Sequence, residues 1–157
     1  SWMMKRVRIF TKMILLTALI CICLTGCGKS TAVTLPFEAA DVAGIEMYRF
    51  VVPASAEKKE ITEPEEIEDV YSTFSNLKVT DKETEPLTGS TVTSFRFRLL
   101  DGTSYEIIYN AEGVKSGRVQ LGEETKDYFT SADIGSLWEN CQEEAVKVDE
   151  AELPAYP

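Results

Sequence analysis

Apolar residues recur at helical spacing in one stretch of the chain. They lie at positions i, i+3, i+4, i+7 and i+10, and they are Ile67, Val70, Tyr71, Phe74 and Leu77. Just before them, Thr62 offers a cap, Glu65 completes a capping box and Pro64 stands in the first turn. We therefore predict an amphipathic helix that begins at Thr62, ends near Asn76 and turns its apolar stripe toward a core.

Several other stretches are rich in β-forming residues or alternate between apolar and polar positions. The first main strand is predicted over Val42 to Val52, where Pro53 stops it. Further strands are expected at Glu60-Ile61, Lys78 to Lys82, Gly117 to Leu121 and Lys126 to Phe129. These segments predict a mostly antiparallel sheet.

The segment around Asp101-Gly102 predicts a β-hairpin, and its loop length decides which side chains share a face. A two-residue loop would place the arginines with the aromatic residues, whereas a three-residue loop with a bulged glycine pairs Leu99 with Thr103. In the second register the residues on one face are Phe95, Phe97, Leu99, Thr103, Tyr105, Ile107 and Tyr109. Arg96 then lies opposite Glu106 and Arg98 opposite Ser104. We expect this bulged register because it gathers the apolar residues on one side.

A second helix is expected after Thr130 or Ser131, either of which can cap it. Its apolar stripe consists of Ile134, Leu137, Trp138, Cys141 and Ala145. Two one-faced helices and an amphipathic sheet can bury one another, so we predict an α+β fold over residues 41–146. The expected architecture is a two-layer sandwich in which a mostly antiparallel sheet of about five strands packs against two helices. Residues 147–157 are predicted to form an acidic, loosely held tail.

The N-terminal segment has the pattern of a secretory signal. Four basic residues (Lys5, Arg6, Arg8 and Lys12) precede an apolar run over residues 13–23, and small residues and a cysteine follow. The run is shorter than the roughly 18–20 residues that cross a bilayer core. The alternative is a short uncleaved anchor. Both interpretations place the chain after about Gly28 outside the cytoplasm.

Leu24-Thr25-Gly26-Cys27 resembles the lipobox of bacterial lipoproteins. The resemblance implies cleavage between Gly26 and Cys27, a diacylglycerol on the thiol of Cys27, and a location on the outer face of the bacterial cytoplasmic membrane in the cell envelope. Residues 1–26 would then be the signal peptide and residues 27–40 the lipidated N-terminus and tether.

The domain itself resembles small exported Firmicute domains of uncharacterised function. The matching features are Ile61-Thr62, Glu66-Ile67, the Phe-x-Phe strand, Asp101-Gly102 and Tyr128-Phe129-Thr130. This resemblance implies a Gram-positive cell-surface lipoprotein, and it supplies no catalytic residue.

Charge narrows the choice of partners. The chain holds 16 Lys and Arg against 26 Asp and Glu, and residues 1–26 contain four of the basic residues and none of the acidic ones, which leaves a net charge of −14. Such a surface repels phosphate, so we expect no nucleic-acid partner, and the lipid rather than a basic patch must hold the protein to the membrane. Cys141 is the one thiol that would remain after processing and lipidation, and we expect it to be buried. We expect the protein to be a monomer.

Candidate catalytic chemistry is sparse. The chain has no histidine, which excludes histidine-dependent triads and the common zinc patterns, and we expect no metal and no cofactor. Ser55-Ala56-Glu57-Lys58 has the Ser-x-x-Lys spacing but stands in a predicted turn without its partner motifs. The alternating Asp81, Glu83 and Glu85 lack the glycine turn of a calcium loop, so we interpret them as a solvated acidic loop.

The sequence therefore favours a non-catalytic binding or protein-interaction module at the cell surface. An envelope protein, a peptide or a cell-wall fragment is the expected ligand, and Arg96, Arg98 and the outward Ile108 form the candidate interaction surface. Alternatively, the tether or the C-terminal tail covers Ile108. The alternative function is a small cell-envelope hydrolase or inhibitor that uses acidic residues between Asp81 and Pro86.

Overall fold

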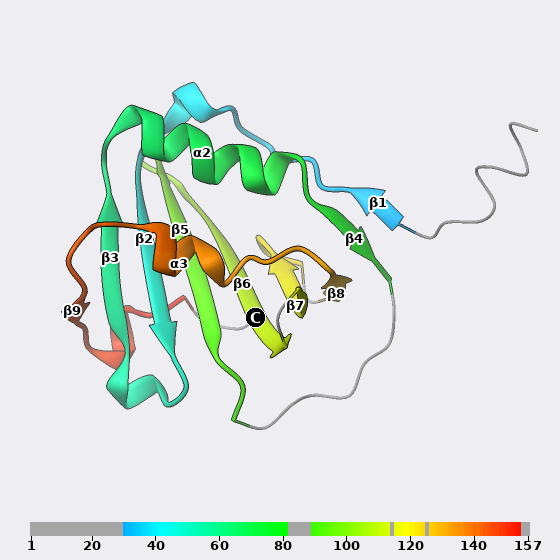
Figure 1. The fold of residues 1–157 in the computed structure, drawn as a ribbon. Helices are drawn as coiled ribbons and strands as arrows, with labels where there is room; N and C mark the ends of the chain where they lie inside the picture. Colours follow the sequence, from blue (N-terminus) through cyan, green and yellow to red (C-terminus); the bar gives the residue numbers. More distant parts are fainter. Residues whose placement is uncertain (1–29, 82–88, 114, 125, 155–157) are drawn as a thin grey trace, which may run out of the picture. The chain divides into compact units, whose positions relative to one another are not determined.

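In the computed structural model, the described residues are 30–81, 89–113, 115–124 and 126–154. All but Ser30 belong to one compact unit, Thr31–Pro157. Within this part of the chain the main feature is a nine-stranded sheet with the order β1-β4-β8-β7-β6-β5-β2-β3-β9 (Figure 1). From β4 to β9 along that order, each neighbouring pair is antiparallel.

The strands are long in the middle of the sheet and short toward its edges. The long ones are β2 (Val42–Phe50), β5 (Val92–Leu99), β6 (Ser104–Gly113) and β7 (Ser116–Leu121). The shorter ones are β3 (Glu57–Ile61), β8 (Asp127–Thr130), β4 (Lys78–Thr80), β1 (Ser30–Ala32) and β9 (Val146–Lys147). The helices are α2 (Pro64–Ser75) and α3 (Ser136–Asn140), with the 3-10 turns η1 (Ala39–Asp41), η2 (Pro53–Ser55) and η3 (Glu150–Glu152).

The expected α+β sandwich is wrong in its proportions. We expected about five strands with two helices as a full layer, whereas the described residues form nine strands and two short helices, a largely β fold. The excess lies mainly in short strands such as β1 and β9, which contain too few residues to show an alternating pattern. Pairing with a neighbouring strand, rather than local sequence, makes them strands.

The predicted second helix also ends early. It was expected to continue through Cys141 toward Ala145, but α3 stops at Asn140 and Cys141 is extended. Lys59 Nζ donates to the carbonyl oxygens of Trp138 and Cys141 at 2.8 and 2.9 Å, the acceptors that a continued helix would need. A lysine from β3 therefore takes the place of the next helical turn.

The hairpin between β5 and β6 confirms the bulged register. Leu99 N donates to Thr103 O at 2.8 Å, and Gly102 has a φ of +88°, the left-handed conformation that the bulge requires. Arg96 pairs with Glu106 and Arg98 with Ser104, as expected. The alternation along these two strands consequently fixes which side chains reach each face of the sheet.

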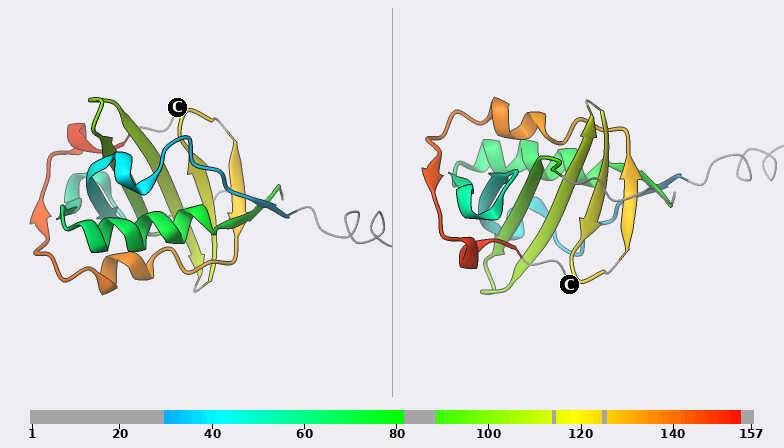
Figure 2. Two further views of the ribbon diagram at one scale, coloured as in Figure 1. Left: turned by 90° about the horizontal axis from the view of Figure 1, so that it is seen from above. Right: turned by 90° about the horizontal axis from the view of Figure 1, so that it is seen from below.

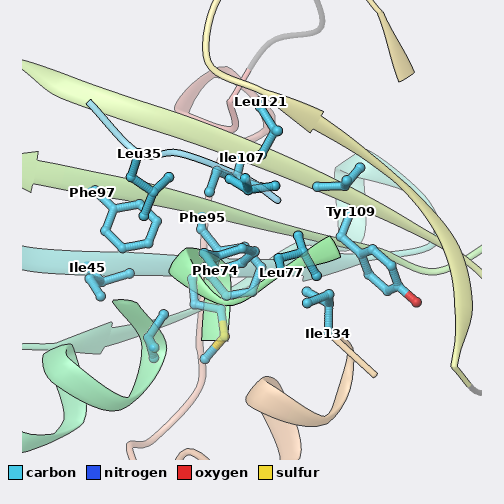
Figure 3. Packing of buried hydrophobic residues seen from close by; sticks show 14 of the residues in the cluster. Leu35, Ile45, Phe74, Leu77, Phe95, Phe97, Ile107, Tyr109, Leu121 and Ile134 are labelled. Carbon is cyan, nitrogen blue, oxygen red and sulfur yellow. The ribbon is translucent and has the colours of Figure 1, made fainter. Parts of the chain in front are cut away.

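The core lies on the face of the sheet that carries α2 and α3 (Figure 2). Phe74 from α2 packs edge-on against Phe95, with ring centroids 4.8 Å apart, and Ile134 and Tyr109 lie beside them (Figure 3). Val33, Leu35 and Phe37 are buried in the same cluster. The described part of the segment expected to be a tether thus contributes to the core.

No helix in the described ranges has both the length and the apolar content needed to cross a bilayer. The apolar run 13–23, Gly26 and Cys27 lie outside the described residues.

Candidate interaction surface

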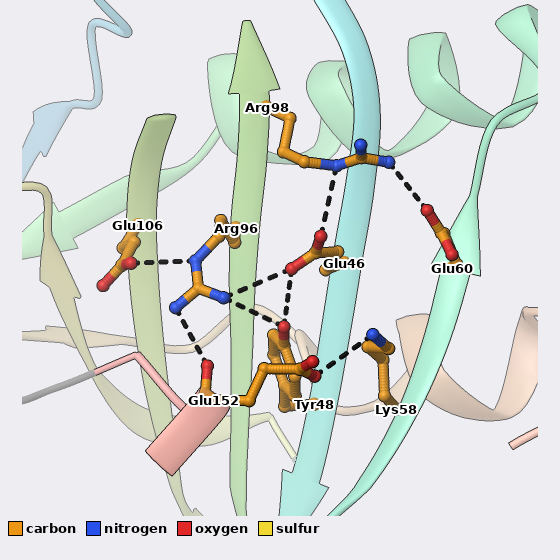
Figure 4. A network of polar contacts seen from close by, with 8 residues as sticks. All are labelled: Glu46, Tyr48, Lys58, Glu60, Arg96, Arg98, Glu106 and Glu152. Atoms are coloured by element: carbon orange, nitrogen blue, oxygen red, sulfur yellow. Dashed lines mark hydrogen bonds and ion pairs between the residues drawn. The ribbon is translucent and has the colours of Figure 1, made fainter. Parts of the chain in front are cut away.

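The sheet face opposite α2 carries a connected set of charged and polar side chains. We call these residues the outer-face network; they are Glu46, Tyr48, Lys58, Glu60, Arg96, Arg98, Glu106 and Glu152 (Figure 4). Strand alternation selects all of them except Glu152 of η3, because every second residue of β2, β3, β5 and β6 points away from the core. Two of the three residues predicted to form the interaction surface, Arg96 and Arg98, belong to this network.

Arg96 lies at the centre of the network. The register places it directly opposite Glu46 on one side and Glu106 on the other. Its Nε donates to Glu106 Oε1 at 3.0 Å, and its Nη1 donates to Tyr48 Oη at 3.0 Å and Glu46 Oε2 at 3.2 Å. Nη2 donates to the carbonyl oxygen of Glu152 at 3.0 Å. All three guanidinium nitrogens therefore bind within the molecule.

Arg98 forms the more exposed margin of the network. Its Nη2 donates to Glu60 Oε1 at 2.7 Å, and its Nε lies 3.2 Å from Glu46 Oε1. Its side chain is 42% exposed, against 21% for Arg96. A Cβ on Gly44 would stand 2.7 Å from Arg98 Nη2, so the glycine leaves the space that the guanidinium crosses to reach β3.

Two groups of the network, Glu46 and Tyr48, have pKa values shifted away from neutral pH. Burial alone would raise the pKa of Glu46, but hydrogen bonds from Tyr48 and Arg96 outweigh it and hold that pKa below its ordinary value. Burial, reinforced by the hydrogen bond to Glu46, raises the pKa of Tyr48. At neutral pH, Glu46 is therefore a carboxylate and Tyr48 a phenol that donates to it at 2.6 Å.

The C-terminal segment, residues 148–154, packs onto this face instead of forming a loose tail. Val148 N donates to Ala56 O at 3.2 Å, Lys58 pairs with Glu152 at 3.1 Å, and Pro154 is buried. β9 pairs with β3 immediately before it. The segment is thus bound at its backbone and through its side chains.

Ile108, the third predicted surface residue, is only 5% exposed. It lies between Ser94 of β5 and Gln120 of β7, both of which are also buried. Ile108 therefore offers little free surface, and Arg98 is the most exposed of the three predicted residues.

The remaining candidates do not converge on a catalytic arrangement. Ser55 ends η2 and Lys58 pairs with Glu152, so the Ser-x-x-Lys motif does not open a helix. Glu83 and Glu85 lie outside the described residues, and Asp81 forms an ion pair with Lys126. No three His, Cys, Asp or Glu side chains are grouped to hold a metal ion within the ranges that the structure describes.

A hollow of about 490 Å³ opens beside the network, between the start of β6 and the turn after β7. Ser104, Glu106, Gly122 and Glu123 line it, together with Tyr105. It places open surface next to the Arg96–Glu106 pair, where a partner could contact the network.

Sequence reasoning missed Glu46, Tyr48, Lys58, Glu60 and Glu152. The alternation of Glu46 and Tyr48 along β2 places them on one face, which is a signal that could have been used. Their contact with Arg96 depends on β2 lying next to β5, and no local pattern specifies that neighbour. No protein-family model, curated protein or solved structure matches this chain.

Proposed function

We propose that this protein is a lipid-anchored lipoprotein of the bacterial cell envelope whose domain is a non-catalytic binding or protein-interaction module. The signal pattern over residues 5–23 and the lipobox at residues 24–27 support the anchor. In this proposal Cys27 carries the lipid on the outer face of the cytoplasmic membrane.

One observation carries the non-catalytic part of the proposal: the outer-face network is internally paired. General acid or base catalysis needs a group with a pKa near the working pH. Pairing lowers the pKa of Glu46, and burial raises that of Tyr48, so both move away from neutrality. Such a surface suits recognition of a charged partner better than proton transfer.

The exposed margin formed by Arg98 and Glu60 is the proposed contact surface. Their side chains are 42% and 50% exposed, and they present opposite charges 2.7 Å apart. Arginine is a frequent interface anchor, because its planar guanidinium forms several directed hydrogen bonds. A partner with a carboxylate can compete with Glu60 for this group.

The anchor is tested by metabolic labelling with an alkyne fatty acid. Cys27→Ser is expected to abolish labelling and membrane retention, whereas the matched control Cys23→Ser, which lies in the apolar run, keeps both. Labelling of the Cys27→Ser variant at the wild-type level would contradict lipidation at this residue.

The contact surface is tested by crosslinking the full-length protein in intact cells. Arg98→Glu is expected to reduce the yield of crosslinked partner, and Lys78→Glu, the same charge change at an exposed residue of β4, is expected to preserve it. Circular dichroism of both variants verifies the fold. Equal yields from the two folded variants would remove this face from consideration.

A further inference from the structure

A narrow groove lies between α2 and α3. The two helices lie side by side on the helical face of the sheet (Figure 2). From α2, the residues that line the groove are Glu66, Asp69 and Val70, which lie at i, i+3 and i+4 and share one face. From α3, Leu137 and Asn140 line it, together with Cys141, which directly follows the helix. Ile61, the last residue of β3, also lines it. The volume is about 110 Å³.

The groove holds acidic groups without cationic partners. Glu66 Oε2 is buried and accepts no hydrogen bond, and neither Glu66 nor Asp69 forms an ion pair with any residue in the described ranges. A buried carboxylate oxygen without a donor is unfavourable. A donor brought in from outside would remove that cost.

Lys59 is a cation close to the groove, but it is already occupied. Its Nζ donates to the carbonyl oxygens of Trp138 and Cys141 and lies 4.7 Å from the centre of the Trp138 ring. Those contacts hold the ammonium at the end of α3. It therefore leaves the carboxylates of α2 unpaired.

We propose that this groove binds the side chain of a lysine from a partner polypeptide. The groove is small, at about 110 Å³, which suits one unbranched side chain. Ile61, Val70 and Leu137 provide apolar contacts for the methylene stem, as lysine stems prefer. The ammonium carries three N–H donors, and Glu66, Asp69 and Asn140 offer acceptor oxygens.

We assign the bound lysine to a polypeptide rather than to a free amine, because one side chain in so small a groove supplies little affinity alone. The flanking face of α2 adds the exposed carboxylates of Glu65 and Glu68, and the chain after residue 26 has 12 basic against 26 acidic residues. A partner with further basic residues would gain from this field. The inference rests on the proposed binding role of the domain, but not on the lipid or on the outer-face network.

The thiol of Cys141 gives a local test in the full-length protein, kept in non-ionic detergent. Aminoethyl methanethiosulfonate carries a cationic stem, and its sulfonatoethyl analogue is anionic. In both reactions the Cys141 thiolate attacks the sulfenyl sulfur, a disulfide forms and methanesulfinate leaves. Mass spectrometry of the peptide that contains Cys141 follows the rate at this site alone.

The cationic reagent is expected to react about tenfold faster than the anionic one, after each rate is divided by that of the unfolded chain. The pair Glu66→Gln and Asp69→Asn should lower this preference toward that of the unfolded chain. The control pair Glu123→Gln and Glu150→Gln changes the net charge equally at exposed positions outside the groove and its flanking face, so it should preserve the preference. Equal preferences in the two double variants would overturn the proposal.

Reversible binding is tested with the tripeptide N-acetyl-Ala-Lys-Ala-amide, which should slow alkylation of Cys141 by iodoacetamide. The Nε-acetyllysine peptide should give no protection. Equal protection by the arginine peptide would overturn the assignment to lysine, and equal protection by free butylamine would overturn the assignment to a polypeptide. Failure here would leave the tests on Cys27 and Arg98 unaffected, so the two proposals fail separately.

Discussion

Arg96 donates a hydrogen bond from Nη2 to the backbone carbonyl of Glu152 at 3.0 Å, across 56 residues of sequence. The same guanidinium binds Glu46 and Glu106 on the two neighbouring strands. One side chain in the middle of the sheet therefore ties β2, β5, β6 and the C-terminal segment together.

Arg96→Ala is expected to destabilise the domain by about 2–3 kcal/mol, because it leaves two half-buried carboxylates without their cation. The backbone amides of residues 148–153 should exchange hydrogen faster as well, since the bond to Glu152 is lost. Urea denaturation measures the free energy of unfolding, and mass spectrometry measures the exchange.

Arg98→Ala is the matched control for this experiment. Its side chain is twice as exposed and its partners lie on β2 and β3 alone, so the expected loss is below about 1 kcal/mol. Exchange in residues 148–153 should not change. If the two variants behave alike, Arg96 does not hold the C-terminal segment.

The lowered pKa of Glu46 predicts a specific acid sensitivity. A carboxyl group whose pKa is lower in the folded state stabilises the fold above its unfolded pKa, near 4.5, and that contribution disappears as the pH falls through the folded pKa. The free energy of unfolding should therefore fall less steeply below pH 4.5 in Glu46→Gln than in the wild type. Curves that stay parallel over this range would contradict the prediction.

The sequence alone was sufficient to predict the features of the fold that depend on contacts between neighbouring segments of the chain. The hairpin register followed from one glycine and from alternation over Phe95 to Tyr109, because a one-residue shift would have exposed the aromatic residues. The Arg96–Glu106 pair came with that register. One part of the contacts of Arg96, its pairing with Glu106, was thus predictable from β5 and β6, which follow each other in the sequence.

The remaining contacts of Arg96 depend on parts of the chain that are distant in sequence. Glu46 and Tyr48 reach Arg96 because β2 lies beside β5, and Glu152 reaches it because the C-terminal segment returns over the sheet. Residues 148–154 have an acidic composition that resembles a solvated tail. The segment packs there through the ion pair of Glu152 with Lys58, the hydrogen bond from Arg96 to the carbonyl oxygen of Glu152 and the backbone hydrogen bond from Val148 to Ala56, none of which a local pattern specifies.

The start of helix α2 was also not predictable from local sequence. The capping box predicted a start at Thr62, but Glu63 is the N-cap, and no side chain caps the helix. Thr62→Ala is therefore expected to change the free energy of unfolding by less than about 0.5 kcal/mol, where a functioning cap would cost about 1. Val70→Ala, at a buried position of the same helix, should cost about 2 kcal/mol and validates the measurement. A loss near 1 kcal/mol for Thr62→Ala would restore the predicted cap.

Gly117 on β7 leaves room for an aromatic ring of the core. A Cβ at this position would stand 2.5 Å from Cε2 of Tyr109, and that ring is 1% exposed, so it has no free volume into which to move. Gly117→Ala is expected to cost about 1–3 kcal/mol, measured by urea denaturation. Gly113→Ala is the control, because nothing lies within 4 Å of its Cβ, and its expected change is within about 0.5 kcal/mol. Equal effects of the two substitutions would mean that the ring of Tyr109 is not packed against β7, and the core would have to be placed differently.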